Sequence, residues 1–177
     1  MTNKQEMFEW AEAHSAEQLA LLKKLAAIPA PSHHEEKRVE FIRNWLIEQG
    51  ACEVSVDEAL NVILRFQHEC DGPYTVFSAH TDVVFPDTTA LPVREENRTL
   101  YAPGVGDDTA NLVALMMIAK YLLEKDFRPL QYSFPRNFHS FLFFQTFASA
   151  FLSLRSSSDR KNRPRSLPGI SKESHCL

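Results

Sequence analysis

The feature that most constrains the fold is an apolar run that ends in histidine and aspartate and is followed by a glycine-containing turn. Residues 74–79 (YTVFSA) are rich in β-branched and aromatic side chains, which predicts a strand in the interior of a sheet. His80-Thr81-Asp82 follows directly, and Gly104-Val105-Gly106 comes before a helix that is predicted to begin at Asp107-Asp108. The order of strand, loop and helix is that of an α/β fold.

Other sequence patterns predict the remaining helices and strands of a single domain. Two amphipathic helices are predicted before residue 51: the first begins at a capping box, Ser15-Ala16-Glu17-Gln18, and ends before Pro29, and the second runs from residues 33–36 (HHEE) to Gly50. Residues 54–57 and 61–66 form a predicted strand pair, and residues 138–144 are a further candidate strand. The sequence therefore predicts two N-terminal helices, a central mixed sheet and a crossover helix.

The charge distribution divides the chain near residue 126. Residues 1–126 carry 21 Asp and Glu against 11 Lys and Arg, whereas residues 127–177 carry 2 against 8. The second segment also holds 8 of the 13 phenylalanines. We therefore divide the chain into an α/β body, residues 1–126, and a divergent tail rich in Phe, Ser and Arg, residues 127–177. The tail is predicted to be largely disordered from about residue 153.

Composition excludes several classes of protein. No apolar run approaches the roughly 20 residues of a membrane-spanning helix, and the first residues are acidic, unlike a signal peptide. The three cysteines are scattered, which predicts reduced thiols and no thiolate zinc site. The basic stretch at residues 155–165 lacks the interleaved aromatic residues of a nucleic-acid module. We therefore expect a cytoplasmic protein with neither a membrane nor a nucleic-acid partner.

Two short clusters could carry chemistry. His80 and Asp82 lie two residues apart, so an extended backbone places both side chains on one side, where a carboxylate can orient a metal-binding imidazole. The alternative is a polar pair bound into a loop. Asp107 and Asp108 present two carboxylates at a helix start, and the alternative there is that Asp108 caps free amides. Two carboxylates also repel phosphate, which disfavours a nucleotide site.

These clusters carry a resemblance. Residues 78–82 (SAHTD), followed by residues 101–108 (YAPGVGDD), resemble the N-terminal half of the catalytic domain of the M20 metallopeptidases, which include tripeptidase T-like enzymes, cytosolic dipeptidases and aminoacylases. The resemblance covers about residues 16–126. It implies a partial zinc-exopeptidase-like α/β sandwich, without the lid domain that often mediates dimerisation. Residues 1–126 are then a truncated M20-like catalytic domain.

The resemblance also implies a role for each residue of the clusters. His80 ligates one zinc ion, Asp82 is a catalytic residue that supports this ligand, and Asp107 bridges two zinc ions. Asp108 is adjacent to the metal and follows Asp107 across a peptide bond that in this family tends to be cis. The implied substrate is a small peptide or an N-acyl amino acid. Thr109 and Ala110 stand where many members have Lys and Gly, so the subfamily stays open.

Other groups that the resemblance requires are not in this chain. In the family a Glu-Glu pair follows the bridging aspartate and supplies the general base and a zinc ligand. The corresponding stretch here, residues 140–146 (SFLFFQT), has no carboxylate. We therefore expect at most weak zinc binding, little or no hydrolysis, and no homodimer in the absence of the lid domain. Whether the chain is an enzyme stays open, and the alternative is a non-catalytic α/β remnant or binding module.

We explain the tail by the hypothesis that residues 127–177 are a divergent or frame-shifted end on a truncated peptidase. The reversal of charge, the composition and the missing glutamates all motivate it. Translation of the encoding DNA in the other two frames tests it. A Glu-Glu segment within a continuing catalytic domain should appear in one frame, and its absence from both would refute the hypothesis.

Overall fold

The computed structural model describes residues 4–66, 74–126 and 139–145. Three helices come first: α1 (Lys4–Ala13), α2 (Ser15–Ala27) and α3 (Glu36–Glu48). The next elements are strands β1 (Val54–Val56), β2 (Val62–Arg65) and β3 (Tyr74–His80) and the hairpin strands β4 (Arg94–Glu96) and β5 (Thr99–Tyr101). A π-helical turn, η1 (Val105–Thr109), leads into helix α4 (Ala110–Glu124), and strand β6 (His139–Gln145) is the last element.

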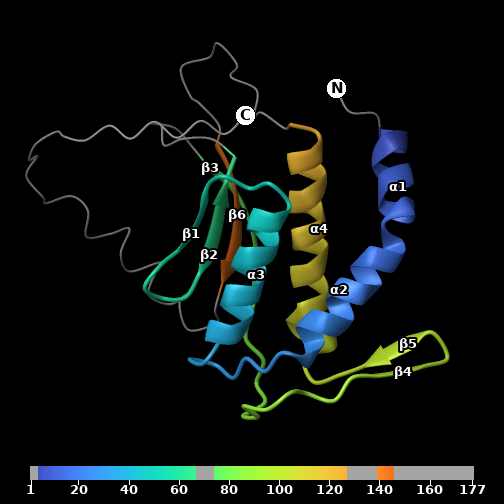
Figure 1. Cartoon of the computed structure of the whole chain (residues 1–177), viewed down its shortest axis with the longest axis vertical. Coiled ribbons are helices and arrows are strands. Elements are labelled where there is room, and N and C mark those ends of the chain that lie inside the picture. The colour runs from blue at the N-terminus through green and yellow to red at the C-terminus, as the bar shows by residue number, and fades with distance from the viewer. Residues whose placement is uncertain (1–3, 67–73, 127–138, 146–177) are drawn as a thin grey trace, which may run out of the picture.

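The four-stranded sheet has the strand order β1-β2-β6-β3 (Figure 1). β2 is antiparallel to both β1 and β6, whereas β6 is parallel to β3, so the predicted mixed sheet is confirmed. The prediction of an interior position for β3 is wrong among the described strands, because β6 lies inside and β3 lies at the edge. Val76 and Phe77 of β3 are accordingly 54% and 52% exposed. Apolar composition alone does not show which of two such strands lies inside a sheet and which lies at its edge.

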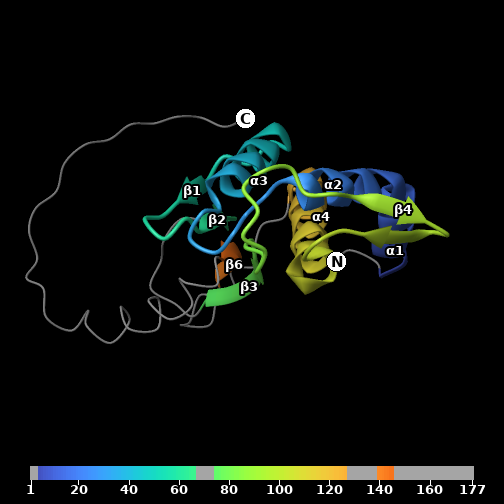
Figure 2. The same ribbon diagram turned by 90° about the horizontal axis from the view of Figure 1, so that it is seen from below.

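Helices and sheet share one core. α3 packs against β1 and β2, and α4 packs against β3 and β6, while α2 lies against α4 (Figures 1 and 2). The α4 helix is apolar on most of its surface because it lies between the sheet and α2. The predicted stripe of α4 is confirmed: Leu112, Leu115, Met116 and Ala119 are all buried. The partial α/β sandwich expected from the sequence is therefore present.

The N-terminal region differs from its prediction. A further helix, α1, precedes the two expected ones, and His14 stands at the break between α1 and α2. Ser15 lies inside the first turn of α2, and the residue at the cap position is His14, which makes no capping hydrogen bond through its side chain. The predicted capping box is therefore wrong. The amide of Gln18 instead donates to the carbonyl of His14, so backbone pairing continues across the break.

Several further predictions can be compared with the structure. The ends before Pro29 and at Gly50 are confirmed, and Gly50 has a φ of +89°. Cys52 is disulfide-bonded, so the prediction of reduced thiols is wrong at this position. None of the helices that the structure describes is both long and apolar enough to cross a membrane. The disorder predicted from about residue 153 lies outside the described residues.

Candidate metal centre

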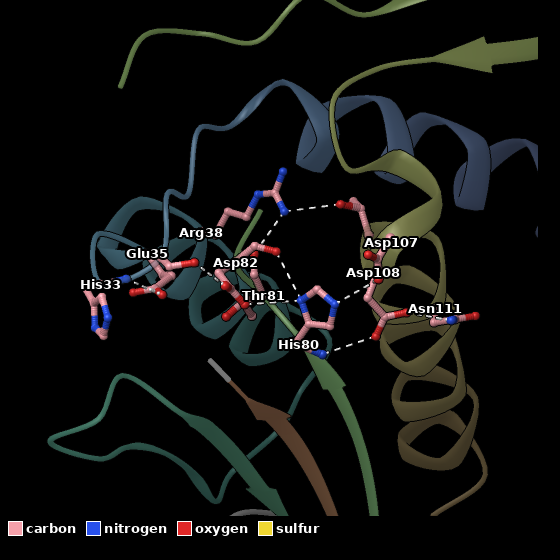
Figure 3. A network of polar contacts seen from close by, with 11 residues as sticks. His33, Glu35, Arg38, His80, Thr81, Asp82, Asp107, Asp108 and Asn111 are labelled. Carbon is pink, nitrogen blue, oxygen red and sulfur yellow. Dashed lines mark hydrogen bonds and ion pairs between the residues drawn. The ribbon is translucent and has the colours of Figure 1, made fainter. Parts of the chain in front are cut away.

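The two predicted clusters meet at the carboxyl end of β3 (Figure 3). The imidazole of His80 lies between two aspartates: its Nε2 is 3.3 Å from Oδ1 of Asp107, and its Nδ1 is 3.2 Å from Oδ1 of Asp82. The side chain of Asp107 is 93% exposed, whereas that of Asp82 is only 4% exposed. The fold therefore brings together three residues predicted from separate motifs, with Asp82 beneath the imidazole and Asp107 at the surface.

The Asp82 carboxylate is held from both sides. Its Oδ2 accepts a hydrogen bond of 2.6 Å from the hydroxyl of Ser32, while Oδ1 faces His80. Ser32 reaches this point because the link between α2 and α3 runs beside the chain after β3. There the amide of Val83 donates to the carbonyl of Ala30 at 2.8 Å. A buried carboxylate fixed in this way can hold one tautomer and one orientation of the neighbouring imidazole.

Asp107 and Asp108 are joined by a cis peptide bond, which agrees with what the family resemblance implies. The two carboxylates have different partners. Asp108 accepts hydrogen bonds from the amide of His80 at 3.2 Å and from the side-chain amide of Asn111 at 2.6 Å. Neither donor is a free backbone amide in the first turn of α4, so the capping interpretation of Asp108 is wrong. Asp108 instead ties the start of α4 to the end of β3.

Gly104 allows the glycine-containing turn to approach the strand end. Its φ is +66°, a conformation that favours glycine, and a Cβ atom at this position would lie 2.3 Å from Cγ1 of Val83. Gly106 has no left-handed φ, and a Cβ atom added to it would have no other atom within 4 Å. Of the two glycines in this turn, only Gly104 therefore has a left-handed backbone and a close approach that favour glycine.

Sequence reasoning missed Arg38, which joins the two clusters from α3. The residue is fully buried, and its Nη1 donates both to the carbonyl of Thr81 at 3.0 Å and to the hydroxyl of Thr109 at 3.2 Å. Burial lowers the pKa of Arg38 to about 10, and the negative charge of Asp82 opposes that shift, so the guanidinium is charged at neutral pH. One sequence pattern could have identified Arg38 as buried: it lies four residues before Ile42 and so falls on the apolar stripe of α3.

The donor set fits part of a zinc site. An imidazole nitrogen and a carboxylate oxygen are ligands that Zn²⁺ takes, and His80 and Asp107 present one of each to the same space. Among the described residues, however, no group of three or more His, Cys, Asp or Glu is arranged to hold a metal ion. The neighbouring strand supplies no carboxylate, because the β6 residue aligned with His80 is Gln145 and β6 contains no Asp or Glu. His33, with a φ of +71°, is exposed in the turn before α3 and belongs to no such group.

Comparisons with known proteins give one family match and several solved structures of similar fold. Residues 76–134 match the family described as Peptidase family M20/M25/M40. The fold resembles the di-peptidase Dug1p of Saccharomyces cerevisiae, with a TM-score of 0.60, 17% identity, and coverage of 86% of this chain and 37% of that one. It also resembles aminopeptidase PepT of Bacillus cereus, with a TM-score of 0.57, 16% identity, and coverage of 81% and 39%.

A third solved structure is the YxeP protein of Bacillus subtilis, described as a dinuclear metal-binding peptidase of the M20 family. It matches with a TM-score of 0.50 and 21% identity over 77% of this chain and 36% of that one. No curated protein matches the sequence significantly. The chain spans less than two fifths of the length of each of the three solved structures. Family match and fold together show that this chain resembles part of an M20 peptidase.

Proposed function

We propose that this chain derives from a zinc-dependent hydrolase of the M20 type that acts on small peptides or related amides. The observation that carries the proposal is the position of His80 between Asp82 and Asp107 at the end of β3. The similar solved structures support it, since they are described as a di-peptidase, an aminopeptidase and a dinuclear metal-binding peptidase. An N-acyl amino acid is the other substrate class that we propose, and the cytoplasm is the proposed location.

Each residue of the site has a different proposed role. Nε2 of His80 and Oδ1 of Asp107 would hold zinc, which supplies Lewis-acid polarisation of the scissile carbonyl when bound. The Nδ1–H group of His80 donates to the carbonyl oxygen of Asp82 at 3.1 Å and lies 3.2 Å from Oδ1 of its carboxylate, so that the lone pair of Nε2 points outward. Asp108 keeps the helix start in place through the amide of His80. The proposed roles of metal ligand, supporting carboxylate and adjacent carboxylate thus fall on four residues with four different sets of contacts.

We predict that the chain by itself hydrolyses no peptide at a measurable rate. A hydrolytic centre of this kind needs a base near the attacking water, and β6 carries Gln145 where it aligns with His80. The measurement is an assay of dipeptides, tripeptides and N-acyl amino acids with and without added Zn²⁺, with His80→Ala as the control. Zinc-dependent hydrolysis that disappears in His80→Ala would show that the chain is an active enzyme.

A non-catalytic α/β remnant or binding module is the second candidate. The observation that favours it is the lack of any three-residue metal cluster within the described part of the chain. Calorimetric titration with Zn²⁺ separates the two candidates, because a complete site of this type takes up two ions. The remnant should bind one ion weakly or none. We propose no nucleic-acid or membrane partner for either candidate, and no homodimer.

A further inference from the structure

Arg38 is a charged residue on an otherwise apolar face. It is 0% exposed, and the other buried residues of α3 are Val39, Ile42 and Leu46. Removing a guanidinium from water is unfavourable unless its donors are bonded. An apolar side chain of similar volume could fill this place at a lower free-energy cost. The presence of arginine therefore calls for an explanation in the contacts that only a guanidinium can make.

Those contacts join three segments that are distant in the sequence. Nε of Arg38 donates to the carbonyl of Ile28 at 2.9 Å, which fixes the chain just after α2. Nη1 donates to the carbonyl of Thr81, the residue between the two members of the first cluster, and to the hydroxyl of Thr109, which directly follows the second. One planar group thus sets the position of the strand end relative to the helix start.

Stability alone does not account for this arrangement. Nη2 of Arg38 is buried and has no hydrogen-bond partner within the part of the chain that the structure describes. An unpaired buried donor lowers the free energy of unfolding. Such a cost is typical of positions where a structural optimum is given up for a functional one. What the contacts of Arg38 provide is a fixed spacing between the two clusters.

We propose that Arg38 is a positioning residue that holds His80 and Asp107 at the separation needed to share a metal ion. The effect on metal rests on the proposed function. The positioning itself does not, because it concerns the arrangement of the protein without metal. The hydrogen bonds of Arg38 go to neither His80 nor Asp107, so it acts through the residues next to them.

The positioning is tested without metal, in the assigned ¹H–¹⁵N spectrum of the full chain. Arg38→Lys keeps the charge, but one ammonium group cannot bond to three acceptors held by a planar fork. We expect the amide resonances of His80 and Asp107 to shift in this variant and to stay unchanged in Arg43→Lys. Arg43 is the matched control because it lies on the same helix, is exposed, and bonds to its neighbour Asn44 instead of to either cluster. Unchanged His80 and Asp107 resonances in Arg38→Lys would overturn the proposal.

A second variant provides a test of the proposal in case Arg38→Lys does not fold. Thr109→Val removes the acceptor on the helix side and leaves the bond from Arg38 to the carbonyl of Thr81. We expect it to shift the Asp107 resonance more than that of Thr81. If Arg38→Lys does not fold, Thr109→Val becomes the deciding variant. An unchanged Asp107 resonance in Thr109→Val would then refute the proposal.

The effect on metal is measured by calorimetry with Zn²⁺ alone. Arg38→Met should bind zinc about tenfold to a hundredfold more weakly than the parent chain, as is usual when groups that orient metal ligands are removed. Arg43→Met should bind as the parent does. Equal affinities of Arg38→Met and the parent contradict the proposal. A parent chain that binds no zinc refutes the proposed function, while the spectra still decide whether Arg38 positions the two clusters.

Discussion

Gly104→Ala is expected to lower the free energy of unfolding by about 2–4 kcal/mol, the sum of backbone strain and overpacking. The φ of Gly104 is +66°, which an alanine adopts only with strain. The added methyl group would also lie 2.3 Å from Cγ1 of Val83, well inside contact distance. Either the turn or the segment after Asp82 must move. Urea denaturation followed by circular dichroism measures the loss.

Gly106→Ala is the matched control. The residue stands two positions further along the same turn, has no left-handed φ, and would place its Cβ in open space. We expect this variant to unfold within about 0.5 kcal/mol of the parent, as substitutions away from special features usually do. Equal stability of the two variants would mean that the turn relaxes without cost, and that the close approach to Val83 is not required for folding.

The parts of the site that could be predicted are those encoded locally. The run before His80 has the composition of a strand, and the glycines before Asp107 mark a turn into a helix. Each motif places its own residues on a strand end or a helix start without reference to the rest of the chain. The parallel pairing of β3 with β6 then puts the carboxyl ends of two strands at one edge, as expected for an α/β sheet.

The parts that could not be predicted depend on contacts between distant segments. Ser32 binds Asp82, and Arg38 binds the strand end and the helix start, over separations of 43 to 71 residues. No local pattern specifies such partners. The capping box failed for a related reason: the amide of Gln18, which the Ser15 hydroxyl would have capped, already donates to the carbonyl of His14. Trp10 secures α1 in that position, since its indole donates to Glu124 at 2.6 Å and its ring meets that of Tyr121 edge to face.

The contrast between the two adjacent aspartates provides the sharpest test of the site. Asp107→Ala is expected to abolish whatever zinc uptake the chain shows, because its carboxylate and the imidazole of His80 are the two donors that face each other. The same change should leave stability within about 0.5 kcal/mol of the parent, since the side chain is 93% exposed. Asp108→Ala should instead cost about 1–2 kcal/mol, because two donors lose a charged acceptor.

Calorimetry with Zn²⁺ and urea denaturation of both variants measure the two effects separately. Each aspartate serves as the control for the other, because the substitutions are chemically identical and adjacent in the chain. We expect Asp107→Ala to lose zinc and keep stability, and Asp108→Ala to lose stability and keep most of any zinc affinity. If both variants lose affinity and stability together, the cis-linked pair acts as a single structural unit, and the assignment of Asp107 as the metal ligand is wrong. A loss confined to affinity in Asp107→Ala shows that the exposed carboxylate serves metal binding and contributes little to the stability of the fold.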